Sequence, residues 1–298
     1  MRFSDLARLI TLAAIWGASF LFVRMAVSSL GAAWLTELRI SIAAAAMLLY
    51  ARAVGLDLEV RRNLHVYLVI GATNVAIPWT IIAYAGHYIN AGYLSILNAS
   101  TPWFGAICAA LWLGEPLTLR KSLGLALGLA GVALMLGFGP IEATPNVILS
   151  AALCFAAAAC YALAGTYVKK RAAGVRPFSM TLGSLLVATL MLLPFLSGVP
   201  PATAFTWKVS IAVLGISLLG SAAAFLLYYR LMSDVGPTKT LTVTFLIPLF
   251  GVLWGVLFLD EELRLAMVVG GALVLAGTAL VVASGPQAAA ARGVSALK

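Results

Sequence analysis

The sequence predicts an all-α polytopic membrane protein, with ten transmembrane helices arranged as two inverted five-helix repeats. Three observations lead to this fold class: a strongly apolar composition, ten apolar stretches of spanning length, and motifs that return later in the chain. Of the 298 residues, 63% are hydrophobic and 10% are charged, against about 45–50% and about 25% in soluble domains. This composition excludes a soluble enzyme, a secreted disulfide scaffold and a disordered regulator.

Ten stretches reach the length of about 20 predominantly apolar residues that a spanning helix needs. They lie near residues 9–28, 32–51, 65–86, 91–113, 121–138, 147–168, 178–196, 208–229, 238–259 and 265–284. The first stretch follows Arg2 and Arg8, as the apolar part of a signal peptide would. Because it contains Trp16 and Arg24 and lacks a clear small-residue cleavage site, we expect it to remain as a helix.

The basic residues predict the orientation of the spans. If the N-terminus is cytoplasmic, the cytoplasmic segments carry Arg2, Arg8, Arg52, Arg61, Arg62, Arg120, Lys121, Lys169, Lys170, Arg171, Arg176, Arg230, Lys239, Arg292 and Lys298. The outer loops then carry only Lys208 and Arg264, while Arg24 and Arg39 fall in the first two spans. Basic residues concentrate on the cytoplasmic side of membrane proteins. Both termini are therefore predicted to be cytoplasmic, and the net charge of +9 needs no nucleic-acid partner.

The second half of the chain repeats motifs of the first. The segment TPWFG at 101–105 returns as IPLFG at 247–251, and LWLGE at 111–115 returns as LFLDE at 257–261, an offset of 146 residues. An offset shorter by one residue aligns Trp16 with Tyr161 and Arg24 with Lys169.

These matches predict a first five-helix repeat over 1–142, a second over 143–284, and a short cytoplasmic tail over 285–298. An odd number of spans in each repeat means that the second enters the membrane from the opposite side. Inverted repeats of this kind are typical of secondary transporters, whose substrate site lies where the halves meet.

A proline within a span, then an aliphatic and aromatic run ending in Leu-Gly-Glu, then a glycine-rich helix, occurs twice in this chain. This pattern resembles the ten-helix EamA-type branch of the drug/metabolite transporter (DMT) superfamily, over about residues 6–284. The second copy departs from it, with Asp260 where glycine is expected. Within the branch, the chain is most similar to bacterial amino-acid exporters of the YddG type. The resemblance implies a multi-pass transporter of the bacterial inner membrane that exports amino acids by alternating access.

Two spans present small and polar residues at helical spacing. The fourth has Asn98, Thr101, Gly105 and Cys108, and the ninth has Thr240, Thr244, Gly251 and Gly255. The offset of 146 places Asn98 on Thr244. These faces either line a substrate cavity or allow close helix packing. Pro102 and Pro248 follow in mid-helix and, with Pro78 in the third span, are candidate hinges.

Aromatic and amide side chains form the candidate substrate site. The predicted binding residues are Trp16, Asn74, Trp79, Tyr84, His87, Asn98, Thr101, Trp103, Tyr161, Tyr228 and Thr244. Such a lining suits a zwitterion with an apolar side chain, which favours neutral and especially aromatic amino acids. Packing is an equal alternative for Trp79 and Trp103, and plain solvation is one for His87. We expect Tyr93 and Trp207 to be interface anchors.

The charges narrow the class of substrate. Phosphate esters would need several cations in the spans, whereas only Arg39 lies clearly within one, and Glu37 is two residues away on a different face. We assign Arg39 a structural role. Glu115 and Glu261 end their helices, where a carboxylate is unfavourable without a partner, so we expect them to act as structural clamps.

The first span has no acidic residue after Asp5, which disfavours proton-coupled export of organic cations. An exporter of drugs, nucleosides or other metabolites on the same fold is the alternative. The chain has no HExxH or GxSxG motif and no pair of membrane carboxylates, so we expect no enzyme activity, cofactor or metal. The expected partners are a small-molecule substrate and the lipid bilayer, without nucleic acid. Glycines of the fifth and tenth spans allow packing within one chain, which favours a monomer.

Overall fold

The computed structural model describes residues 3–139, 141–172, 174–198, 200, 202–235, 240 and 242–283. Within these ranges the chain forms helices and connecting turns, and no strand occurs among them. Nine helical segments of the described chain are long and apolar enough to cross a membrane, and Val243–Leu259 is a shorter apolar helix. All ten predicted stretches therefore contain helix, which confirms the fold class. The predicted tail, 285–298, lies outside the described residues.

The first repeat comprises α1 (Phe3–Leu30), α2 (Ala32–Ala53), α3 (Val60–Ile70), the π-helical segment η1 (Gly71–Ala76), α4 (Ile77–Ala85), α5 (Ala91–Asn98), α6 (Thr101–Leu113) and α7 (Leu119–Phe138). The second comprises α8 (Pro145–Arg171), α9 (Pro177–Leu192), the 3₁₀ turns η2 (Leu193–Phe195) and η3 (Ala202–Ala204), α10 (Trp207–Leu214), the π-helical segment η4 (Gly215–Ala223), α11 (Ala224–Val235), α13 (Val243–Leu259) and α14 (Leu265–Val282). We call the end of the bundle where α1 begins the N side, and the other end the opposite side.

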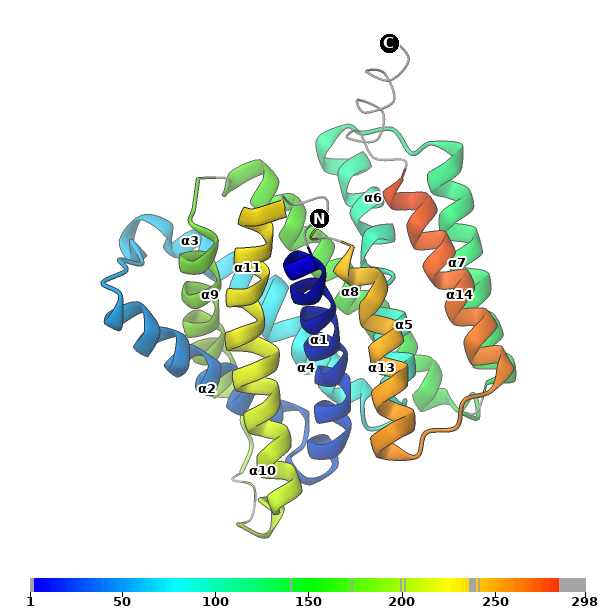
Figure 1. Cartoon of the computed structure of the whole chain (residues 1–298), viewed down its shortest axis with the longest axis horizontal. Coiled ribbons are helices and arrows are strands. Elements are labelled where there is room, and N and C mark those ends of the chain that lie inside the picture. Colours follow the sequence, from blue (N-terminus) through cyan, green and yellow to red (C-terminus); the bar gives the residue numbers. More distant parts are fainter. Residues whose placement is uncertain are drawn as a thin grey trace.

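The two halves meet along α7 and α14, which run side by side at one edge of the molecule (Figure 1). Glycines allow their backbones to touch. A Cβ atom on Gly131 would lie 2.5 Å from the carbonyl oxygen of Gly270, and one on Gly270 would lie 2.5 Å from that of Gly131. Gly124 and Gly277 meet in the same way. The predicted packing of these glycines within one chain is therefore confirmed.

Both repeats distort the same helix. The third span contains η1 between α3 and α4, and the eighth contains η4 between α10 and α11. The offset of 146 carries residues 71–76 onto 217–222, which lie inside η4. Wider π-helical turns are rare and occur frequently at functional sites. The shared position indicates that the distortion belongs to the repeat and not to one local sequence.

The expectation that Pro102 kinks the middle of a helix is wrong. The fourth span is divided into α5 and α6 by a turn at Ala99 and Ser100, and Pro102 lies in the first turn of α6. A proline there costs no backbone hydrogen bond, because the first N–H groups of a helix have no partner within it. The small polar residues of this span therefore do not share one continuous helix. Pro78 differs from Pro102, because α4 continues directly from η1 and Pro78 therefore lies inside a continuous helical span. Pro248 lies inside α13 as predicted.

Tyr93 is not an interface anchor. Its side chain is fully buried, and its hydroxyl donates a hydrogen bond to the Met135 carbonyl at 2.6 Å. The short helix α5 packs against α8, α13 and α14, so a residue near the end of a span is covered by protein instead of headgroups. Trp207, by contrast, is 70% exposed.

Candidate substrate site

An aromatic cluster built from both halves occupies the interior of the bundle. On one side, Trp16 of α1 lies with its ring centre 5.4 Å from Tyr228 and 6.1 Å from Phe225, both on α11. On the other, Tyr161 of α8 lies beside Trp79 of α4. Four of the predicted binding residues therefore belong to this cluster.

The cluster contains the same contact twice. Trp16 and Tyr161 are repeat-related, and the offset of 146 also places Trp79 on Phe225. The first repeat supplies Trp16 to Phe225 of the second, and the second supplies Tyr161 to Trp79 of the first. Sequence reasoning missed Phe225, although the offset applied to Trp79 would have found it.

Arg39 of α2 joins this cluster. Its guanidinium carbon lies 3.5 Å from the centre of the Trp79 ring, and its Nε donates to Ser221 Oγ at 3.0 Å. The Ser221 hydroxyl in turn donates to the Ile216 carbonyl at 3.0 Å, five residues earlier, in π-helical register. A residue assigned a structural role from sequence therefore lies beside the candidate binding residues.

The other predicted polar residues lie at helix breaks and helix starts. Asn74 is half-buried in η1, and Thr244 is in the first turn of α13. Asn98 ends α5 and Thr101 begins α6, where the Thr101 hydroxyl donates to the Asn98 carbonyl at 2.8 Å. These positions remain predictions.

Trp103 is held by helix packing. Its indole N–H donates to Thr278 Oγ1 on α14 at 2.9 Å, and Thr278 donates to the Ala99 carbonyl at 3.0 Å. Only 2% of Trp103 is exposed. Its polar group and its ring are therefore both covered by protein, as the packing alternative for Trp103 requires.

Tyr84 and His87 lie toward the opposite side. Tyr88 links them, with ring centres 5.5 Å from Tyr84 and 6.2 Å from His87. The His87 side chain follows the end of α4 and is exposed. Partial desolvation and the positive charge of Arg24 lower the pKa of His87. The role of Tyr84 and His87 in substrate binding stays a prediction.

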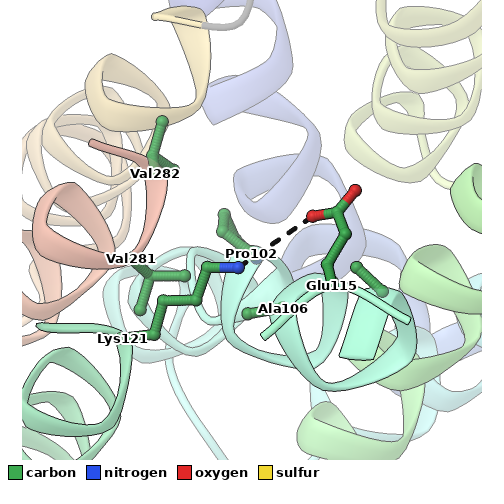
Figure 2. Close-up of a pocket in the computed structure, with 8 residues that line it drawn as sticks. Pro102, Ala106, Glu115, Lys121, Val281 and Val282 are labelled. Atoms are coloured by element: carbon green, nitrogen blue, oxygen red, sulfur yellow. Dashed lines mark ion pairs between the residues drawn. The ribbon is translucent and has the colours of Figure 1, made fainter. Parts of the chain in front are cut away.

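Glu115 has partners on two other helices at the N side. Its Oε1 lies 3.0 Å from Lys169 Nζ on α8, and its Oε2 lies 4.0 Å from Lys121 Nζ on α7. Figure 2 shows Lys121 reaching toward Glu115 across a pocket of about 170 Å³ between α6, α7 and α14. Its lining, which includes Pro102 and Val281 and the residues Gly105, Ala106, Ala109 and Val282, has no aromatic side chain. The lining of this pocket therefore differs from the aromatic cluster.

Glu261 has a different kind of partner at the opposite side. Its Oε1 and Oε2 accept hydrogen bonds from the backbone N–H groups of Ala91 at 2.7 Å and Gly92 at 3.2 Å, at the start of α5. Burial raises the pKa of Glu261, although these two bonds and the charge of Arg24 act in the other direction. The partners that the sequence required for both carboxylates are present.

Comparison with known proteins gives two copies of one family. The EamA-like transporter family matches residues 6–137 and again residues 148–283. An uncharacterized transporter, YvbV, of Bacillus subtilis is 28% identical over 243 residues, which cover 80% of this chain and 78% of that protein. A probable terminal-alkyne amino-acid exporter of Streptantibioticus cattleyicolor is 24% identical over 273 residues, 89% of each chain. A solved crystal structure superposes with a TM-score of 0.61 at 19% identity, covering 94% of this chain and 96% of the other.

Proposed function

The chain belongs to the EamA-like transporter family, and from this premise we propose that it exports amino acids, mainly neutral and aromatic ones, and related small metabolites. In this proposal the two inverted halves alternate in opening the aromatic cluster to either side of the membrane. The chain acts as a transporter and not as an enzyme. Its membrane is the bacterial inner membrane, with the N side and both termini in the cytoplasm.

The aromatic cluster is the observation that carries this proposal. Trp16, Phe225 and Tyr228 offer an apolar and aromatic wall at the meeting of the two halves. Burying a phenyl or indole side chain against such a wall is worth about 1.5–3 kcal/mol. Arg39 and Ser221 add polar groups beside it, as a zwitterionic substrate requires. The similarity to a probable amino-acid exporter supports the same class of substrate.

Transport into proteoliposomes that contain the purified full-length chain tests the proposal. We expect flux of labelled phenylalanine, tyrosine or tryptophan, measured with and without a pH gradient to detect proton coupling. Trp16→Ala should lower this flux at least about tenfold, the effect of about 1.4 kcal/mol. Trp207→Ala is the matched control, because Trp207 is 70% exposed and lies at a helix start.

Two results would contradict the proposal. Absence of flux for all twenty amino acids with folded protein would reject amino-acid export. Flux of nucleosides or cationic drugs in the same vesicles, unaffected by excess phenylalanine, would favour the alternative of drug or metabolite export.

A further inference from the structure

We propose that Arg39 binds the carboxylate of the transported substrate, so that the site selects small molecules with one carboxylate beside an apolar group. This rests on the proposed function, because it assigns Arg39 to the same site. The observation behind it is an interior guanidinium that both halves hold in place while its two terminal amino groups have no hydrogen-bond or carboxylate partner among the described residues.

Two contacts fix the orientation of Arg39. Trp79 from the first repeat covers one face of the guanidinium at 3.5 Å. Ser221 from the second repeat accepts a hydrogen bond from Nε at 3.0 Å, and its own proton is committed to Ile216. Trp79 follows η1 and Ser221 lies in η4, so the distorted helices of both repeats supply the support. Neither of these contacts uses the edge of the guanidinium that carries Nη1 and Nη2.

That edge has no partner in the part of the chain that the structure describes. Neither terminal nitrogen of Arg39 makes a hydrogen bond there, and no carboxylate oxygen lies within 4.0 Å. Glu37, two residues earlier on α2, is buried and does not pair with it. Arg39 is half-buried, so the edge is not sealed by packing.

Basic residues near the ends of the spans lie beside carboxylates: Arg8 is 2.6 Å from Asp234, and Lys121 is 4.0 Å from Glu115. Arg24, within the first span, donates to the Gly86 carbonyl at 2.6 Å. Keeping a cation inside a membrane protein is costly unless an opposite charge or strong acceptors compensate it. For Arg39, one hydroxyl and an aromatic face supply only part of this compensation. An anionic substrate would supply the rest.

The geometry of the free edge selects a carboxylate. Two parallel N–H groups of a guanidinium match the two oxygens of a carboxylate in a bidentate pair. A phosphate ester would need further cations, and the aromatic cluster contains none besides Arg39 among its described contacts. Phe225 lies four residues after Ser221 on the same helix and contacts Trp16. A substrate held by Arg39 would therefore turn its apolar part toward the aromatic wall.

Three related probes test the assignment by equilibrium binding to the purified chain. L-Phenylalanine has a carboxylate and an ammonium group, 3-phenylpropionate has only the carboxylate, and phenethylamine has only the ammonium group. Each is measured on the wild type, Arg39→Gln, Arg39→Lys and Arg52→Gln. Arg52 is the matched control, because it is an exposed arginine at the end of the same helix. Melting temperature and chromatographic behaviour report folding, and Arg39→Lys carries the test if Arg39→Gln does not fold.

We expect the wild type and Arg52→Gln to bind both carboxylates at least tenfold more tightly than phenethylamine. Arg39→Gln should weaken both carboxylates by 10- to 100-fold and leave phenethylamine unchanged. The affinity of Arg39→Lys for both carboxylates should lie between those of the wild type and Arg39→Gln, because lysine keeps the positive charge but lacks the two parallel N–H groups of the guanidinium. Wild-type affinity for the carboxylates in folded Arg39→Gln and Arg39→Lys would overturn the assignment. Equal binding of phenethylamine and 3-phenylpropionate by the wild type, or binding of none of the probes, would also overturn it.

The two proposals fail in different ways. Arg39-dependent binding of 3-phenylpropionate without flux of any amino acid would reject the proposed function and keep the carboxylate site. Undiminished phenylalanine flux in Arg39→Gln would keep the proposed function and reject the carboxylate site.

Discussion

The two sides of the bundle use repeat-related glutamates in different ways. At the N side, Glu115 of the first repeat forms an ion pair with Lys169 of the second at 3.0 Å, and Lys169 is 64% exposed. At the opposite side, the equivalent Glu261 bonds to two backbone N–H groups at the start of α5. Arg24, the counterpart of Lys169, donates instead to the Gly86 carbonyl.

This difference predicts that the contacts of Glu115 and Glu261 hold the two sides of the bundle closed with unequal free energies. An exposed ion pair that holds a long side chain contributes about 0–1 kcal/mol, whereas a side chain that caps a helix N-terminus contributes about 0.5–2 kcal/mol. Backbone groups also fix the position of the contact more firmly than a lysine does. We therefore expect the N side to open at lower cost than the opposite side, although the two repeats share one architecture.

The seam between α7 and α14 is the region where the repeats should not differ. Gly131→Leu would place a side chain against the Gly270 carbonyl, and Gly277→Leu, its counterpart, would meet α7 in the same way. We expect each to cost about 3 kcal/mol or more, because neither backbone can move aside. The melting temperature and monodisperse fraction in detergent measure this. Gly137→Leu on the same helix is the control, since a Cβ there meets nothing within 4 Å. A wild-type melting temperature for Gly131→Leu would contradict this packing.

The sequence predicted what depends on local pattern and symmetry. Apolar stretches located the ten spans, the offset related the two halves, and helix-end electrostatics required partners for Glu115 and Glu261. The stack of Arg39 on Trp79 could not be predicted from the sequence, because it joins side chains of α2 and α4 that are 40 residues apart and depends on how these two helices pack. The prediction that Tyr93 is an interface anchor was wrong for a related reason. Its position near the end of a span suggested contact with the membrane interface, whereas other helices cover α5 in the fold.

The two prolines of the repeated motif occupy different positions in their helices, so their removal should affect the two repeats differently. Pro248 lies inside α13, where its ring removes a hydrogen bond to the carbonyl four residues earlier. Pro248→Ala should therefore raise stability by about 1–3 kcal/mol, and slow transport if α13 must bend there. Pro102 is in the first turn of α6, so Pro102→Ala should change stability by less than about 1 kcal/mol. Melting temperatures and initial rates of flux measure both. Unchanged rates in both variants would remove the hinge interpretation.

Removing each glutamate sharpens the comparison of the two sides. Glu261→Ala should cost about 1–2 kcal/mol, because it leaves the first N–H groups of α5 without acceptors. Glu115→Ala should cost about 1 kcal/mol or less, because its closest partner is the exposed Lys169, and the buried Lys121, 4.0 Å away, keeps its hydrogen bond to the Pro116 carbonyl. Glu262→Ala is the control, since that side chain is 69% exposed and its ion pair is with Arg264, two residues away. Thermal unfolding of the three variants orders them, and an equal loss for Glu115→Ala and Glu261→Ala would show that both sides are held alike.

The residue that ends each motif helix gives the smallest and most direct comparison. Gly114 and Asp260 occupy equivalent positions, and both adopt the left-handed conformation, with φ of 71° and 52°. In both repeats the next N–H returns to a carbonyl of the last helical turn, at 3.1 Å and 3.2 Å. The departure from glycine therefore leaves the backbone unchanged and costs only the penalty of a Cβ atom in this region. Asp260→Gly should raise the stability by up to about 1 kcal/mol, and Gly114→Asp should lower it by a similar amount. A lower melting temperature for Asp260→Gly would show that the Asp260 carboxylate itself stabilises the loop, and that the two repeats differ here in more than backbone strain.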